Sequence, residues 1–240
     1  MLKIFQVTAF SDNYIWVISD GSNAWVVDPG DAAPVIRFLN ESALKLEGIL
    51  LTHWHGDHQG GVEELCDQNR DLEIIGSHKV LKGPSSAVSE NDAVNVLGAM
   101  FKVLEVPGHT LDHVAFISTS ELFETPVAFT GDTMFAAGCG RLFEGTSDDM
   151  FCSLNKINDF PENTLIYCGH EYTLANLKYA VHAEPKNPDI LNRLNEVTVM
   201  RDQGISTIPT TLTLERLTNP FLRATNSAEL GQRRLEKDKF

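Results

Sequence analysis

The segment of residues 48–61, "GILLTHWHGDHQGG", constrains the fold more than any other part of the chain. Its first residues form a short, continuously apolar run of the kind that is buried in a sheet. Three histidines and one aspartate follow within the six positions from His53 to His58, and Gly56 relaxes the backbone among them. Since so many polar donors directly after a buried strand are hard to explain as solvated surface, the segment predicts a metal site at a strand end.

The spacing of these donors indicates that they face two directions. His53 and His55 lie two positions apart, which places both side chains on one face if strand geometry persists beyond Thr52. Asp57 and His58 are adjacent and cannot point the same way on a strand, so we expect them on the following loop. This arrangement suits two neighbouring ions. Imidazole and carboxylate donors without cysteine suit zinc, iron or manganese and argue against a closed structural zinc site.

Three further donors follow other predicted strands, each directly after a glycine. His109 comes after the apolar segment 101–106, Asp132 after 127–130, and His170 after 165–167. A lone histidine after a strand is weak support for a ligand. Because the cluster at 53–58 already predicts a metal, the repeated pattern of strand, glycine and donor strengthens all three positions together.

The overall composition and charge bound the class of protein. Hydrophobic residues make up 42% and charged residues 22% of the 240 residues, as in an ordinary soluble globular chain. The formal net charge of −14 argues against nucleic acid or an anionic membrane as a partner, since both need a basic surface. An anionic substrate would likewise need a local basic patch against this acidic background.

Cysteine usage and the N-terminus predict a cytoplasmic location. The four cysteines, Cys66, Cys139, Cys152 and Cys168, have no CxxC spacing, which fits reduced thiols in a cytosolic protein. The N-terminal segment lacks a basic region and an unbroken apolar run, so no signal peptide is expected. No apolar stretch approaches the roughly 18 residues of a membrane span.

The pattern of apolar residues predicts an α/β fold followed by helices. Short strands are expected over 4–10, 13–19, 24–27, 48–52, 73–75, 101–106, 114–118, 127–130 and 165–167, with helices over 33–40 and 62–69. From about His170 the pattern is helical, with helices over 176–184 and 188–204 and another near 209–217. We therefore expect a layered α/β domain over residues 1–169 and a small α-helical domain over 170–240.

The motif "THWHGDH" resembles the THxHxDH signature of the metallo-β-lactamase superfamily, whose fold is an αββα sandwich with a dinuclear metal site. Within that superfamily the chain is most similar to the glyoxalase II (hydroxyacylglutathione hydrolase) family. The similarity covers essentially the whole chain and is carried by "DNYIWV" (12–17), "VDPG" (27–30), "GCGRLFEGT" (138–146), "CGHEYTLANLKYA" (168–180), "NPFLR" (219–223) and the ending "RRLEKDKF".

The resemblance implies a division of the ligands between two divalent metal ions, with zinc expected first and iron or manganese as alternatives. One ion would sit on His53, His55 and His109, the second on Asp57, His58 and His170, and Asp132 would bridge them. The implied reaction is hydrolysis of S-D-lactoylglutathione and related S-2-hydroxyacylglutathiones by a metal-bridging hydroxide, with Asp57, His58 and Asp132 in catalytic roles. It yields glutathione and a 2-hydroxy acid such as D-lactate, which is the second step of methylglyoxal detoxification.

The resemblance also implies a glutathione site, whose basic residues would supply the local positive charge that an anionic substrate needs in this acidic chain. The matching positions are Arg141, Tyr172, Arg234 and Lys237, with Phe143 where the family can carry a tyrosine. Arg234 and Lys237 lie one helical turn apart and suit a paired cationic grip, although a solvated charged tail is an equal alternative.

The sequence assigns no single role to two other residues, Asp112 and Asp28. The family more often has glycine where Asp112 stands beside the predicted ligand His109, and the sequence gives no account of the change. Asp28, in the Asp-Pro-Gly turn, either supports the metal site from behind its ligands or serves the turn alone.

Three other functions remain open on the sequence. A mononuclear-iron persulfide dioxygenase would need only His53, His109 and Asp132 as ligands. A β-lactamase or lactonase would have no use for the segments "HEYTLANLKYA" and "RRLEKDKF". A non-catalytic binding protein would have no need for the intact set of metal ligands. We expect a monomeric hydrolase whose partner is a glutathione thioester.

Overall fold

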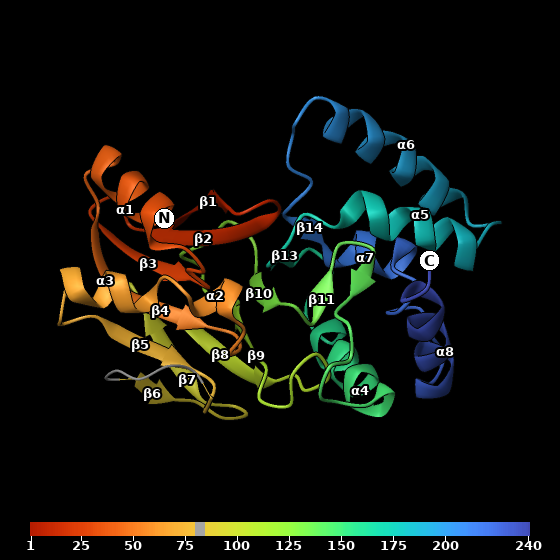
Figure 1. Cartoon of the computed structure of the whole chain (residues 1–240), viewed down its shortest axis with the longest axis horizontal. Coiled ribbons are helices and arrows are strands. Elements are labelled where there is room, and N and C mark those ends of the chain that lie inside the picture. The colour runs from red at the N-terminus through yellow and green to blue at the C-terminus, as the bar shows by residue number, and fades with distance from the viewer. Residues whose placement is uncertain (80–84) are drawn as a thin grey trace.

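The computed structural model describes residues 1–79 and 85–240, and its two large β-sheets pack face to face. The C-terminal helices gather at one end of the long axis, at the right of Figure 1, and the N-terminal sheet lies at the other end. None of the helices in these two ranges is both long and apolar enough to cross a bilayer.

The first sheet has the strand order β1-β2-β3-β4-β5-β6. Its strands are β1 (Lys3–Ala9), β2 (Asn13–Ser19), β3 (Asn23–Val27), β4 (Lys45–Leu51), β5 (Glu73–Gly76) and β6 (Ser85–Ala87). The first three strands pair antiparallel and the others parallel. Parallel strands need crossover connections, and these contain α1 (Ala32–Glu41), α2 (Gly56–Gln59) and α3 (Val62–Gln68).

The second sheet has the order β14-β13-β10-β9-β8-β7. Its strands are β7 (Ala93–Val96), β8 (Ala99–Glu105), β9 (Val114–Ser118), β10 (Val127–Gly131), β13 (Leu165–Cys168) and β14 (Thr210–Thr211). Between β10 and β13 the chain forms a small hairpin, β11 (Met134–Phe135) with β12 (Gly138–Cys139), and then α4 (Ser147–Asn158).

The apolar core lies in layers that follow the alternation of side chains along each strand. Trp16 and Ile18 of β2 point between the two sheets, where they share a cluster with Phe101 and Phe116. The intervening residues Ile15 and Val17 belong instead to the cluster under α1 and α3. Helices α4 and α8 (Ser227–Lys237) cover the outer face of the second sheet. This layering is the predicted αββα sandwich.

The C-terminal region consists mostly of helices, namely α5 (Thr173–Ala183), α6 (Pro188–Asp202), α7 (Leu212–Thr218) and α8. The helix predicted over 188–204 is therefore confirmed, whereas the helix predicted near 209–217 begins only at Leu212. The expectation of a wholly helical pattern after His170 was wrong at β14, whose Thr211 pairs antiparallel with Leu165 of β13. This strand extends the second sheet, and the division of the chain at 169/170 stays a prediction.

A buried ion pair joins the C-terminal helices to the β11–β12 hairpin. Arg193 Nη2 donates to Glu215 Oε1 at 2.7 Å, and both side chains are buried. The other oxygen of Glu215 accepts from the backbone N–H of Ala137 at 2.7 Å and from Asn219 Nδ2 at 3.0 Å. Ala137 lies in the hairpin turn with a φ of +54°, a conformation that costs energy for a residue other than glycine. Glu215 therefore fixes a turn that would otherwise be unfavourable.

We expect Glu215→Ala to lower the free energy of unfolding by about 3–5 kcal/mol, because it leaves the Arg193 charge buried without its partner. Urea denaturation followed by circular dichroism measures this change. Glu196→Ala, which removes an exposed carboxylate from the same region, should change stability by less than about 0.5 kcal/mol. Equal effects of the two substitutions would contradict a stabilising role for the buried pair.

Candidate metal centre and adjoining pocket

The predicted donors come from strand ends of both sheets. Strand β4 ends at Leu51, so the strand geometry that would put His53 and His55 on one face does not continue past Thr52. Asp57 and His58 lie on the one-turn helix α2 rather than in a loop. The glycine that precedes a donor allows the backbone to approach the other ligands closely. A Cβ on Gly169 would lie 2.6 Å from His58 Cε1 and 2.8 Å from Asp132 Oδ1.

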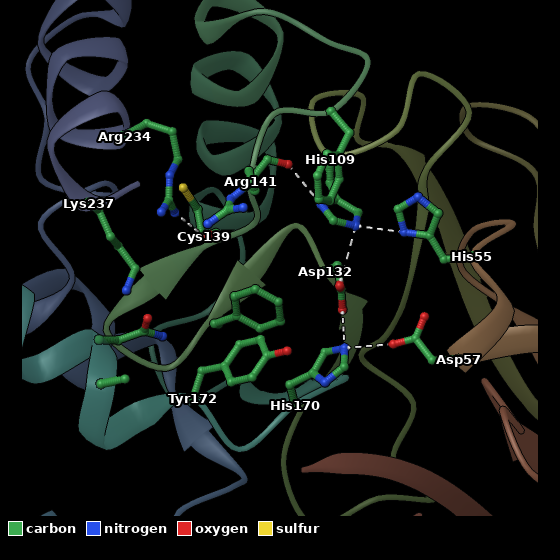
Figure 2. Close-up of a pocket in the computed structure, with 14 residues that line it drawn as sticks. His55, Asp57, His109, Asp132, Cys139, Arg141, His170, Tyr172, Arg234 and Lys237 are labelled. Atoms are coloured by element: carbon green, nitrogen blue, oxygen red, sulfur yellow. Dashed lines mark hydrogen bonds and ion pairs between the residues drawn. The ribbon is translucent and has the colours of Figure 1, made fainter. Parts of the chain in front are cut away.

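Asp132 lies at the centre of the converging donors (Figure 2). Its Oδ1 is 3.3 Å from His58 Nε2 and 3.4 Å from His170 Nε2, whereas its Oδ2 is 3.4 Å from His109 Nε2. The two oxygens of one buried carboxylate therefore face two different groups of ligand atoms.

The remaining donors divide into two groups on either side of Asp132. His53, His55 and His109 each offer a ring nitrogen, and these atoms lie within 4.8 Å of one another. Asp57, His58 and His170 form a second such group. All seven residues predicted as ligands are thus brought together in an arrangement that can hold two cations.

Three of the histidines are oriented by a partner on the nitrogen that faces away from the centre. These contacts are His58 Nδ1 to Asp28 Oδ2 (3.0 Å), His170 Nδ1 to Asp12 Oδ1 (2.8 Å) and His109 Nδ1 to the carbonyl of Arg141 (2.8 Å). Such outer partners fix the ring and leave the other nitrogen free for a metal. Asp28 also accepts from the backbone N–H and hydroxyl of Thr52, so it serves the site as well as the turn.

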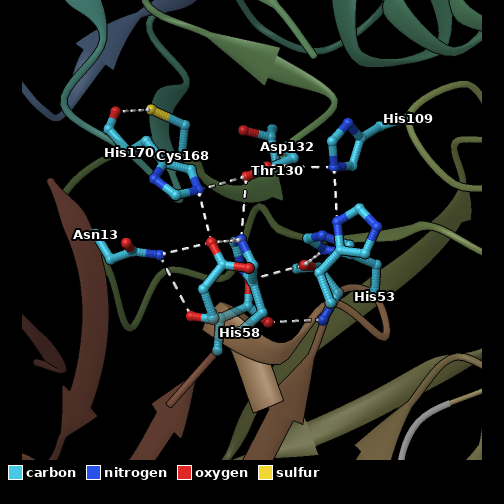
Figure 3. Close-up of polar contacts among 12 residues, drawn as sticks. Asn13, His53, His58, His109, Thr130, Asp132, Cys168 and His170 are labelled. Atoms are coloured by element: carbon cyan, nitrogen blue, oxygen red, sulfur yellow. Dashed lines mark hydrogen bonds and ion pairs between the residues drawn. The ribbon is translucent and has the colours of Figure 1, made fainter. Parts of the chain in front are cut away.

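Three inward-facing atoms of the cluster are buried without a hydrogen bond in the described part of the chain. They are His53 Nε2, His58 Nε2 and Asp132 Oδ1, all close together in Figure 3. Buried polar atoms in folded proteins almost always have a partner, since an unsatisfied one is costly. The donor set therefore fits bound cations, which would satisfy all three atoms.

Burial and neighbouring charges displace the pKa values of these groups in opposite directions. Burial lowers the pKa of His53 well below its usual range. Burial also opposes the charged forms of His58 and Asp132, but their mutual attraction outweighs it, so the pKa of His58 rises and that of Asp132 falls. The hydrogen bond to His170 lowers the pKa of Asp57. Both carboxylates are therefore ionised at neutral pH, the form that binds metal.

The sequence did not identify several residues that support the ligands. His113 stacks on His53 with ring centroids 4.6 Å apart, and its Nε2 accepts from the backbone N–H of Asp132 at 3.1 Å. Asp12 was visible only as part of a family-like segment. Asp112, unexplained from the sequence, accepts from Ser77 Oγ at 2.6 Å and so ties the loop that carries His109 to the end of β5.

A pocket of about 520 Å³ extends from the donor cluster to a cationic end. Figure 2 shows Arg234 and Lys237 at the end opposite His55 and Asp57. All five residues predicted to bind substrate line this pocket, namely Arg141, Phe143, Tyr172, Arg234 and Lys237. Cys139 and Asn176 also line it, although no chemical motif singled them out.

The aromatic residues lie at the donor end of this pocket. The Tyr172 ring stacks on His170 with centroids 4.6 Å apart. Phe143 is 61% exposed, and its ring contacts those of His109 and His55 at centroid distances of 5.2 and 5.8 Å.

The two C-terminal cations do not form a solvated tail. Arg234 is buried and donates to the carbonyl of Cys139 at 2.8 Å, and its guanidinium lies 5.1 Å from the Phe221 ring. Lys237 Nζ lies 5.7 Å from the Tyr179 ring. Both residues stand on α8, which packs against α4 and so lies against the second sheet.

Two protein-family models match the chain. The model described as the metallo-β-lactamase superfamily matches residues 8–170, and that described as the hydroxyacylglutathione hydrolase C-terminus matches residues 171–239. With the donor cluster, the superfamily match makes this a site for divalent metal ions.

Similar solved structures share the fold. A structure of ETHE1 from Myxococcus xanthus has a TM-score of 0.72 at 23% identity and covers 98% of this chain and 90% of its own. A structure of TTHA1623 in a di-iron-bound form has a TM-score of 0.65 at 25% identity and covers 90% of this chain and 99% of its own.

Curated relatives match at much higher identity. A hydroxyacylglutathione hydrolase from Photobacterium profundum is 49% identical over 93% of this chain and 87% of its own length. One from Cupriavidus metallidurans is 47% identical over 95% of this chain and 88% of its own. The chain therefore belongs to the hydroxyacylglutathione hydrolase family, within the metallo-β-lactamase superfamily.

Proposed function

We propose that the protein hydrolyses S-D-lactoylglutathione and related S-2-hydroxyacylglutathiones to glutathione and a 2-hydroxy acid, as in the second step of methylglyoxal detoxification. One observation carries the proposal: a single pocket joins a two-sided His/Asp cluster to three cationic side chains. The name hydroxyacylglutathione hydrolase on relatives that match nearly the whole chain supports the same reaction.

We assign two divalent ions to the cluster. His53, His55 and His109 would hold one, and Asp57, His58 and His170 the other, with one oxygen of Asp132 for each. Bound there, the ions would polarise the thioester carbonyl and lower the pKa of water. Zinc suits the donor set best, and iron or manganese also fits it. The di-iron form of the similar structure TTHA1623 supports two ions on this scaffold.

The residues around the cluster prepare it for hydrolysis. Asp28 and Asp12 hold the rings of His58 and His170 so that each Nε2 faces inward. Asp57, His58 and Asp132 carry the catalytic roles in this assignment, because they hold the water-activating centre together. The leaving group is a thiolate whose conjugate acid has a pKa of about 8.5, so no separate general acid is needed to protonate it.

The cationic end of the pocket suits the glutathione moiety, which carries two carboxylates. Arg141, Arg234 and Lys237 supply positive charge there, against a formal net charge of −14 for the whole chain. Tyr172 and Phe143 flank the donor cluster, where the thioester would lie. The alternative persulfide dioxygenase would use one iron on His53, His109 and Asp132. It gives no role to the second group around His58 and His170.

We also expect the protein to act as a monomer in the cytoplasm. All proposed ligands and substrate-binding residues come from one chain, so the site is complete without a second subunit. The four cysteines are all free thiols, as in a reducing compartment.

A thioesterase assay on S-D-lactoylglutathione, with metal quantified in the same preparation, tests the function. We expect stoichiometric release of glutathione and close to two metal ions per chain. Oxygen consumption with glutathione persulfide, in a protein that does not cleave the thioester, would overturn the proposal in favour of the dioxygenase.

His58→Ala and Asp57→Ala should each lower turnover about a hundredfold or more and also reduce the bound metal, because both substitutions remove a ligand of the same ion. Elemental analysis of the purified variants reads the metal content independently of activity. Asp67→Ala removes an exposed carboxylate of α3 nearby and should leave both quantities unchanged. Full metal content and activity in either ligand variant would contradict the dinuclear assignment.

The affinity for the anionic substrate should fall as the pH rises through about 8. Burial, together with the positive charges of the nearby Arg234 and Arg141, lowers the pKa of Lys237 to about 8. The lysine is thus charged below this pH and neutral above it, so kcat/KM should decline on the alkaline side while kcat changes little.

Lys237→Arg is the matched control, because arginine stays charged throughout this range. In this variant the alkaline decline should be much weaker. Ionisation of the substrate's own amine is common to both proteins and does not explain a difference. The same alkaline profile in both would show that Lys237 does not set it.

A further inference from the structure

We propose that Asp238 is a positioning residue that holds Arg141 and Arg234 in the orientation that receives a substrate carboxylate, an inference that rests on the proposed function. Its Oδ1 accepts a hydrogen bond from Arg141 Nε at 3.1 Å and another from Arg234 Nη2 at 3.0 Å. One carboxylate oxygen thus connects two arginines that are far apart in the sequence and line the same pocket.

The two arginines depend on Asp238 to different degrees. Arg234 has further anchors, since its side chain is buried, donates to the carbonyl of Cys139 and stacks over Phe221. The Arg141 side chain is 56% exposed, and within the described residues its guanidinium hydrogen-bonds only to Asp238. Asp238 therefore acts mainly on Arg141, which would otherwise sample many rotamers in solvent.

The contact to Asp238 leaves Arg141 able to bind a ligand. It occupies Nε and leaves both terminal nitrogens of the guanidinium to donate to a carboxylate. Arg141, Arg234 and Lys237 carry three positive charges against the one negative charge of Asp238, so this end of the pocket stays cationic. Ordering a long side chain before the substrate arrives removes that entropic cost from binding.

Asp238 also has a second effect on substrate binding, which acts in the opposite direction. A carboxylate beside two arginines competes with the substrate for the same donors, so its removal would strengthen binding. Among the described residues, Asp238 is the one hydrogen-bond partner of the Arg141 guanidinium, and it occupies Nε while both terminal nitrogens stay available. We therefore expect that removal of Asp238 weakens substrate binding, because disordering Arg141 costs more than is gained by removing a competing carboxylate.

The experiment compares Asp238→Ala and Asp238→Asn in the full-length protein, alone and combined with Arg141→Ala. Steady-state kinetics on S-D-lactoylglutathione should give a KM raised about three- to tenfold in Asp238→Ala, with kcat unchanged. Asp238→Asn keeps an oxygen acceptor at the same place and should restore a KM close to that of the unmodified protein. The double variant Arg141→Ala/Asp238→Ala should have a KM close to that of Arg141→Ala alone, since the Arg141 guanidinium is gone and Arg234 keeps its anchors on Cys139 and Phe221.

Two controls keep the result specific. Asp202→Ala removes an exposed carboxylate from the last residue of α6 and should leave KM unchanged. Turnover of a small thioester without glutathione should be the same in Asp238→Ala, Asp238→Asn and the unmodified protein. Asp238→Ser, which suits a helix end, carries the same expectation should the alanine variant unfold.

Several outcomes would overturn the inference. They are an unchanged or lowered KM in Asp238→Ala, an asparagine variant as impaired as the alanine variant, and additive effects in the double variant. Failure of the proposed function is distinguishable, because the unmodified protein would then not cleave the glutathione thioester at all.

Discussion

The Asp132 carboxylate is the interaction on which the rest of the site depends. It is buried at the end of β10, and its two oxygens face His58 and His170 on one side and His109 on the other. Two ionised carboxylates and five imidazoles can share so small a volume only if their lone pairs converge on positive charge. The layered fold serves this requirement, because β4 of one sheet and β10 and β13 of the other end at the same place.

The second constraint is that the backbone beside each donor must come very close to other side chains of the site, which explains why glycines precede the donors. Gly131 has a φ of +47°, and a Cβ there would lie 2.4 Å from Thr52 Oγ1 and 2.8 Å from the His113 ring. Asp132 and the His53 segment can therefore approach each other only across a residue without a side chain. The same contact region includes the hydrogen bond from Asp132 N–H to His113 Nε2, so the central carboxylate is also held through its backbone.

Local sequence patterns predicted the fold and the convergence of the metal-type donors, but they did not predict the short strands or the residues that support the donors. Buried strands followed by a glycine and a donor have a strong local signature, and all seven predicted ligands do lie together. The two-residue strands β11, β12 and β14 have no such signature, because their formation depends on long-range partners such as Glu215, which binds the N–H of Ala137. The supporting roles of Asp12 and His113 were not predicted for a similar reason. Nothing in their sequence neighbourhood indicates that each contacts a ligand far along the chain.

The uneven distribution of charge links the stability of the C-terminal helices to recognition. The pocket is cationic in a chain of net charge −14, so attraction of an anionic substrate depends on where α8 lies rather than on the overall charge. Helix α8 is held against the body of the protein by the buried Leu230 and by Arg234, whose guanidinium binds the carbonyl of Cys139 in the hairpin. The hairpin is fixed in turn by Glu215 of α7. Leu230 and Glu215, which bind no substrate in this assignment, thus help to determine where the cations lie.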